Sequence, residues 1–150
     1  MPTDMTINRS ERTVRMILVD TSVIIGYLKG RENEKVLLFH EILERKIPYG
    51  ISAYTFQEIL QGARDDTEWC VLHEYLSTQS IYYLSPVLGT FEKGARLYYD
   101  LRRGGVTPRS TIDLLIVLTA MENELALLHD DRDFDMIAEH FPGLRVWDQL

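Results

Sequence analysis

The sequence predicts an α/β domain in three layers, α/β/α, around a central, mainly parallel sheet of five strands. Short apolar runs alternate along the chain with stretches of helical period, and no repeat or linker interrupts the alternation. The apolar runs are continuous, which is typical of strands buried on both faces of a parallel sheet. With 150 residues, of which 45% are hydrophobic, the chain has the size and composition of one domain with a sizeable core.

Five apolar runs carry the strand pattern, and turn residues or charges bound several of them. We expect the strands at 16–19, 49–51, 81–84, 125–129 and 144–147. The first ends sharply at Asp20, the second follows Pro48, and the third is closed by Pro86. The fourth runs into the acidic stretch 130–133, so two of the predicted strands end directly at acids.

Six stretches carry the helical pattern, in which apolar residues recur every three or four positions. We expect helices at 31–45, 52–62, 67–77, 88–103, 110–123 and 132–140. Pro48 follows the first, Gly62 lies at the end of the second, and Gly104 and Gly105 stop the fourth. The helix at 110–123 is apolar almost all round, which predicts that it is buried.

Charge and cysteine content exclude several classes of protein. Acidic residues outnumber basic ones by 23 to 16, and this argues against a protein that binds nucleic acid over its whole surface. A nuclease is not excluded, because a site made of carboxylates and metal itself adds acid. Cys70 is the single cysteine, which rules out an internal disulfide and favours a reducing, cytoplasmic setting. Its place in a predicted helix makes it a core residue rather than a nucleophile.

The amino-terminal end and the longest apolar run give expectations about location. The first 15 residues are polar and lack the apolar stretch of a secretory signal. We expect a flexible arm at 1–15, or sequence upstream of a true start at Met16, and a domain at 16–150. The longest apolar run, 114–118, is far shorter than the ~20 residues that cross a bilayer, so no membrane association is expected.

Carboxylates gather at the predicted carboxyl edge of the sheet, where α/β sheets bind their ligands. Asp20 follows the first strand, the acidic stretch 130–133 follows the fourth, and Asp113 lies in the first turn of the buried helix. Glu58 lies opposite the apolar stripe of its helix, facing either solvent or a polar cleft. Each acid alone also fits an ordinary role, such as a helix cap, but these roles leave the convergence of separate junctions unexplained.

Clustered carboxylates indicate a particular kind of chemistry. They repel one another unless a cation lies among them, and their hard oxygen ligands favour Mg²⁺ or Mn²⁺ over zinc. Such an ion suits phosphoryl transfer with water as the nucleophile. The motifs GxGxxG, GxxxxGK[ST] and GxSxG do not occur, and the histidines are scattered. His129 lies beside the acidic stretch, but a lone histidine at a strand end is more often structural than a ligand.

Four short motifs contain these acids in order along the chain: VDTSVI (19–24), TFQEILQG (55–62), TIDLLI (111–116) and HDDRDFD (129–135). Together they resemble the motifs of the PIN-domain ribonucleases, most closely those of the VapC toxins of toxin–antitoxin pairs. Each motif alone is weak, but all four stand in order at expected element boundaries. The resemblance spans 16–147 and implies a PIN-like fold that cleaves single-stranded or looped RNA with Mg²⁺ or Mn²⁺.

The resemblance also implies a role for each acid. The candidate catalytic set is Asp20, Ser22, Glu58, Asp113 and Asp131. Asp20, Asp113 and Asp131 would bind the metal, Glu58 would do so through water, and metal-activated water would attack the phosphodiester. Thr21 or Ser22 would help to place the water or the metal, and Ser22 is the preferred polar helper. Asp133 is the alternative fourth acid, because several acids crowd together at that position.

The resemblance further implies a homodimer and a VapB-type antitoxin whose carboxyl-terminal segment covers the site. RNA needs some positive surface, and the candidate contacts are Arg96, Arg103 and Arg109, although a solvated helix face is the ordinary interpretation. Of Tyr98 and Tyr99 nearby, helical spacing makes one a core residue. Two alternative functions stay open: a PIN-like module that binds protein or RNA without cleaving, and a carboxylate-rich phosphohydrolase of small esters.

Overall fold

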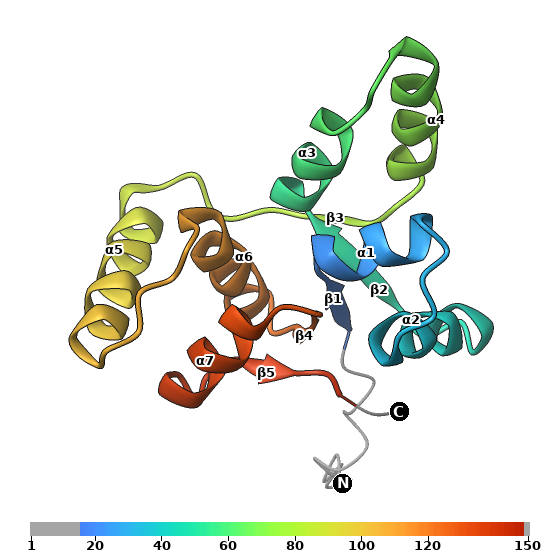
Figure 1. Ribbon diagram of the computed structural model, residues 1–150. Helices are drawn as coiled ribbons and strands as arrows, with labels where there is room; N and C mark the ends of the chain where they lie inside the picture. The colour runs from blue at the N-terminus through green and yellow to red at the C-terminus, as the bar shows by residue number, and fades with distance from the viewer. Residues whose placement is uncertain (1–15, 149–150) are drawn as a thin grey trace, which may run out of the picture.

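Five short strands form one sheet in the computed structural model, which describes residues 16–148 (Figure 1). The strands are β1 (Ile17–Val19), β2 (Tyr49–Ser52), β3 (Ile81–Tyr82), β4 (Ala126–Leu128) and β5 (Arg145–Val146). Their order is β3-β2-β1-β4-β5, and every neighbouring pair is parallel. The predicted parallel sheet of five strands is confirmed. The expected arm at 1–15 lies outside the described residues.

Helices connect the strands along the described part of the chain. They are α1 (Thr21–Leu28), α2 (Glu34–Glu44), α3 (Ala53–Gln61), α4 (Asp66–Ser77), α5 (Leu88–Arg103), α6 (Thr111–Glu122) and α7 (Arg132–His140). All except α1 match predicted helices to within a few residues. The α1 segment is rich in β-branched residues of modest helix propensity, and the burial of Val23 and Ile24 stabilises it.

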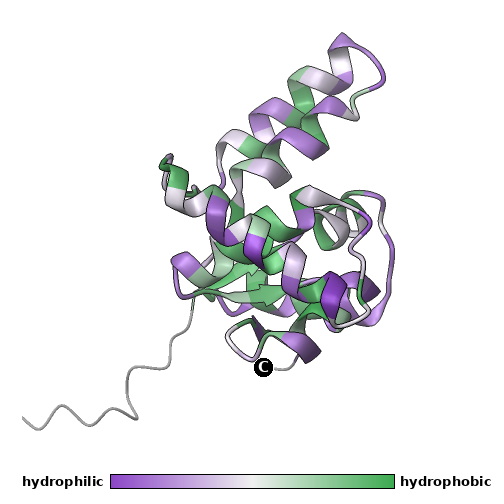
Figure 2. Ribbon diagram, turned by 90° about the vertical axis from the view of Figure 1, so that its left-hand side faces the viewer, coloured by the Kyte–Doolittle hydropathy of each residue, from purple (hydrophilic) through white to green (hydrophobic). Residues whose placement is uncertain are grey.

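Helices cover both faces of the sheet, as the side chains of the central strand β1 show. Leu18 packs into a core with α5, α6 and α7, whereas Ile17 and Val19 pack into a second core with α1, α2 and α3. All three side chains are fully buried. The strands accordingly form a hydrophobic centre in Figure 2. The predicted three layers are confirmed, and so is the burial of α6, which belongs to the first core.

The hairpin of α3 and α4 projects from the rest of the molecule (Figures 1 and 2). Within α4, Leu76 is the buried residue, close to the end of the helix that meets the sheet. Cys70 lies on the exposed length of α4, so the prediction of a core cysteine is wrong. The physical reason is that α4 reaches the core only with its last turns. No helix among residues 16–148 is long and apolar enough to cross a bilayer.

The carboxyl ends of β1 and β4 lie side by side, and this arrangement positions the candidate site. Val19 pairs with Leu128 in the parallel register, and the backbone N–H of Asp20 donates to the carbonyl oxygen of Leu128 at 2.8 Å. The acids that follow these two strands therefore meet at one edge of the sheet, as the sequence predicts.

Candidate functional site

Asp20 lies at the junction of β1 and α1, and only 4% of its surface is exposed. Its carboxylate caps α1 by accepting hydrogen bonds from the backbone N–H of Ser22 at 3.1 Å and from Ser22 Oγ at 2.6 Å. Ser22 Oγ also accepts a hydrogen bond from the backbone N–H of Asp130 at 3.0 Å. Ser22 therefore joins the β1 junction to the β4 junction and holds the Asp20 carboxylate in place.

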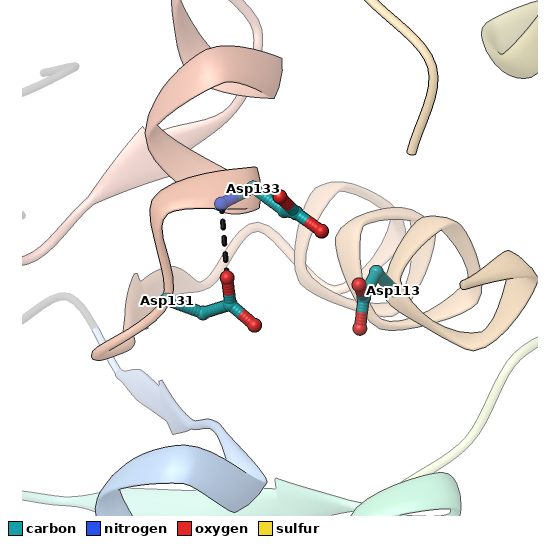
Figure 3. A group of neighbouring side chains, drawn as sticks. All are labelled: Asp113, Asp131 and Asp133. Atoms are coloured by element: carbon teal, nitrogen blue, oxygen red, sulfur yellow. Dashed lines mark hydrogen bonds between the residues drawn. The ribbon is translucent and has the colours of Figure 1, made fainter. Parts of the chain in front are cut away.

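Three more carboxylates form a close group at the starts of α6 and α7 (Figure 3). Asp113 lies in the first turn of α6, and Asp131 caps α7 by accepting a hydrogen bond from the backbone N–H of Asp133 at 2.9 Å. One oxygen from each of Asp113, Asp131 and Asp133 lies within 4.8 Å of the others. The structure therefore brings both candidates for the fourth acid, Asp131 and Asp133, next to Asp113.

The acids at this edge influence one another's ionisation. Burial raises the pKa of Asp113 to about 7, with further contributions from the negative charges of Asp20, Asp131, Asp133 and Glu58. Burial also raises the pKa of Asp20 to about 6, against the hydrogen bonds from Ser22 that lower it. The carboxylates at this edge thus carry more negative charge than the neighbouring groups neutralise. Oxygen donors with this charge excess fit a hard divalent cation.

Glu58 is half-buried on α3 and faces the site rather than open solvent. Its carboxylate accepts a hydrogen bond from Thr21 Oγ1 at 2.9 Å, and Thr21 Oγ1 lies 3.0 Å from Thr55 Oγ1. Ser52 Oγ donates to Thr55 Oγ1 at 3.2 Å, which extends the chain of hydroxyl groups into the buried end of β2. Because Thr21 has a single hydroxyl proton and donates it to Glu58, the hydroxyl of Thr55 donates to Thr21.

Arg109 is a basic residue in this acidic surface, and sequence reasoning did not place it there. Its Nε donates to Asp133 Oδ2 at 2.9 Å, and its Nη2 lies 3.4 Å from Asp131 Oδ1. The same residue lines a pocket of about 460 Å³ beside the acids, together with Arg132, Asp133 and Met136. Its position in the sequence, directly before the Ser110 cap of α6, is the signal that indicates proximity to Asp113.

His129 stabilises the acidic loop that follows β4, which is the structural role that the sequence favours for this histidine. Its side chain is buried, and Nδ1 accepts a hydrogen bond from the backbone N–H of Asp131 at 3.2 Å. Burial lowers the pKa of this imidazole, which favours the neutral ring that such an acceptor requires. The ring also packs against Phe134, with centroids 5.1 Å apart.

The three arginines that the sequence predicts as RNA contacts lie in two separate places, on α5 and at the acids. Arg96 and Arg103 flank the ring of Tyr99 on α5, at 5.2 and 5.7 Å from its centroid, and Arg96 Nε also lies 3.1 Å from Asp100 Oδ1. Arg109 instead lies among the acids of the candidate site. Tyr98 packs against the core while Tyr99 is exposed, which confirms that one of the two tyrosines is a core residue.

Comparison with known proteins adds a match to this fold and geometry. The family model of the PIN domain matches residues 17–140 of the sequence, from β1 to the last residue of α7. The chain belongs to the PIN domain family. Two relatives of this PIN domain are VapC ribonuclease Mb1587 of Mycobacterium bovis and Ribonuclease VapC11 of Mycobacterium tuberculosis. Each is 30% identical over 124 residues, which cover 82% of this chain and 92% of the relative.

Solved structures share the PIN fold. VapBC2 from Rickettsia felis, bound to a DNA fragment from its promoter, superposes with a TM-score of 0.68 at 18% identity and covers 88% of this chain and 97% of its own. DNA-bound VapBC from Salmonella typhimurium gives 0.67 at 20% identity, covering 89% of this chain and 96% of its own. At these identities the likeness establishes the three-layer architecture.

Proposed function

We propose that this PIN domain protein is a divalent-metal-dependent endoribonuclease, the toxin of a type II toxin–antitoxin pair. The observation that carries the proposal is the convergence of Asp20, Asp113, Asp131 and Asp133 from separate junctions onto one edge of the sheet. The raised pKa values of Asp20 and Asp113 indicate charge that only protons or a cation can offset. The ribonuclease names of the VapC relatives support the reaction class.

The chain's acids divide into groups that would hold the ion and groups that would position the reactants. Asp113, Asp131 and Asp133 would hold Mg²⁺ or Mn²⁺ together with Asp20. The bound ion would neutralise charge on the phosphate and lower the pKa of water, the nucleophile. Glu58, held by Thr21 at 2.9 Å, would act through water and orient it for in-line attack.

Ser22 has a positioning role in this proposal. By donating to the Asp20 carboxylate and accepting from Asp130 N–H, it limits the movement of the most buried acid relative to the α7 loop. A fixed carboxylate costs less entropy to organise around an ion than a mobile one.

The proposed partners are RNA, a VapB-type antitoxin and a second copy of the chain. Solved neighbours of this fold include VapBC complexes from Rickettsia felis and Salmonella typhimurium and a toxin–antitoxin complex from Klebsiella pneumoniae, which support the antitoxin. RNA would contact Arg96 and Arg103 around Tyr99, where an aromatic ring between two cations can stack on a base.

Cleavage of a labelled pool of total RNA tests the proposed reaction. Purified protein is incubated with Mn²⁺, with Mg²⁺ and with EDTA, beside an Asp113→Asn variant and an Asp66→Asn control. Asp66 lies exposed on α4 and contributes to none of the acid contacts described above. We expect discrete fragments with metal, none with EDTA or Asp113→Asn, and unchanged fragments with Asp66→Asn.

The alternative functions give different results in the same experiment. Asp113→Asn is expected to keep its affinity for RNA, measured by gel shift, while losing cleavage. Folded, metal-loaded and antitoxin-free protein that binds RNA without cutting it would favour the binding module. Hydrolysis of a chromogenic phosphate ester without RNA cleavage would favour the small-ester phosphohydrolase.

A further inference from the structure

Arg109 contacts two of the three carboxylates that form the closest acid group. Its guanidinium lies 2.9 Å from Asp133 Oδ2 and 3.4 Å from Asp131 Oδ1. The oxygens of Asp131, Asp133 and Asp113 in turn lie within 4.8 Å of one another. A divalent ion and the Arg109 guanidinium would therefore draw on overlapping sets of oxygen atoms.

Arg109 and its two carboxylate partners differ in how firmly the surrounding protein holds their side chains. The Arg109 side chain is 76% exposed, whereas the Asp133 and Asp131 side chains are 15% and 31% exposed. Asp131 is further fixed by the hydrogen bond from the backbone N–H of Asp133. Exposed ion pairs are weak and screened, so the arginine is the partner that can leave at low cost.

Among residues 16–148, Arg109 is the basic residue that forms ion pairs with this acid group. Arg132 lines the same pocket of about 460 Å³, but it forms no ion pair with any residue between 16 and 148. The contact of Arg109 is thus specific, and not a consequence of general positive charge around the acids.

We propose that Arg109 is an internal counter-cation of the acid group, which pairs with Asp131 and Asp133 without metal and is displaced when a divalent ion binds. This inference rests on the metal site of the proposed function. The side chain weakens metal binding by competing for the oxygens, and prevents Asp131 and Asp133 from repelling each other in the metal-free protein. Once released, it lies at the pocket beside the acids, available to a phosphate group.

Calorimetric titration of the full chain with Mn²⁺ tests this competition without relying on activity. Arg109→Gln removes the charge, Arg109→Lys keeps it, and Arg132→Gln is the matched control from the same pocket. We expect Arg109→Gln to lower the Kd for Mn²⁺ about three- to fivefold, the upper part of the range that exposed ion pairs support. Arg132→Gln should stay within about twofold of the wild type, and Arg109→Lys should lie between the two.

A second readout follows the arginine itself. In the ¹H–¹⁵N spectrum, the Nε–Hε signal of Arg109, identified by its loss in Arg109→Lys, should shift and exchange faster with water when Mg²⁺ is added. An unchanged or higher Kd in Arg109→Gln, an equal effect of Arg132→Gln, or a signal indifferent to Mg²⁺ would overturn the inference. Absence of Mn²⁺ binding in the wild type would instead contradict the metal site of the proposed function.

Discussion

Two effects raise the pKa of Asp113, namely burial and the negative charges of other acids. The side chain is withdrawn from water at the first turn of α6, and four other acids act on it, so its pKa rises to about 7. In the unfolded chain the same group has its ordinary pKa of 3.8. Folding therefore favours the protonated carboxyl and disfavours the carboxylate, and the metal-free protein loses free energy of unfolding as pH rises from about 4 to about 7.

The Asp113→Asn variant should remove this cost. In EDTA at pH 8 we expect the variant to be more stable than the wild type by about 1–2 kcal/mol, below the ~4 kcal/mol of the full pKa difference because solvent screens the site. At pH 3 the difference should nearly vanish, since the Asp113 carboxyl is then largely protonated in both the folded and the unfolded chain. Urea unfolding at the two pH values measures it. A stability difference independent of pH would show that the carboxylate charge is not the cause.

Acids of the candidate site cap two helices and lie in the first turn of a third, so a structural role accompanies the proposed metal-binding role. Asp20 caps α1 and Asp131 caps α7, and Asp113 lies in the first turn of α6. The ordinary interpretation of each acid as a helix-start residue is therefore correct for the caps, and it does not compete with the functional one. A helix cap and a metal ligand both use a preorganised side-chain oxygen, so one aspartate can serve as either.

Two substitutions of Asp131 separate these functions. Asparagine caps helices as well as aspartate does, so Asp131→Asn should keep the stability of the protein, whereas Asp131→Ala should cost about 1 kcal/mol. Both variants should bind Mn²⁺ more weakly, because both lose the carboxylate. Thermal unfolding in EDTA and Mn²⁺ titration measure the two effects. Equal destabilisation by both substitutions would mean that the cap of α7 contributes little.

The whole molecule carries a net charge of −7, so its affinity for RNA depends on where the few basic groups lie. Arg96 and Arg103 lie together at Tyr99 on α5, beside the helix that carries Asp113. We expect repulsion between RNA and the acidic remainder of the surface to restrict binding to this region. We therefore expect few phosphate contacts and a modest dependence of affinity on salt.

Salt titration of RNA binding tests the location of these contacts. With the Asp113→Asn variant and a short single-stranded RNA, Arg103→Gln should reduce the slope of log K against log salt by about 0.7, the value for one phosphate contact. Arg45→Gln, at the exposed end of α2, should leave the slope unchanged. Fluorescence anisotropy at several salt concentrations gives the slopes. Equal slopes for the two variants would locate RNA binding elsewhere.

The sequence predicted those features that depend on periodicity and on strand ends. Asp20 and Asp131 were expected at one edge because parallel strands bring their carboxyl ends together, and β1 and β4 are neighbours. For Glu58 the sequence leaves solvent and a polar cleft as alternatives, since a helical wheel gives the direction of a side chain but not its neighbour, which is Thr21 of α1.

Features that depend on contacts between distant segments cannot be predicted from the local sequence pattern. The exposure of Cys70 follows from how far α4 extends past the sheet, and no local pattern encodes that length. The sequence predicts Arg109 as an RNA contact but does not predict its ion pairs with Asp131 and Asp133, because the conformation of the loop before α6 decides these partners. Hydrophobic period specifies where helices and strands lie, while loop side chains are placed by contacts between distant segments.

The projecting α4 also provides a convenient spectroscopic position. Cys70 is the single thiol in the chain, and it is exposed on a helix of which only Leu76 is buried. A maleimide dye or a nitroxide would therefore attach at one defined place without any substitution. Its mobility and its distance to a second label would follow the hairpin as metal, RNA or a protein partner is added.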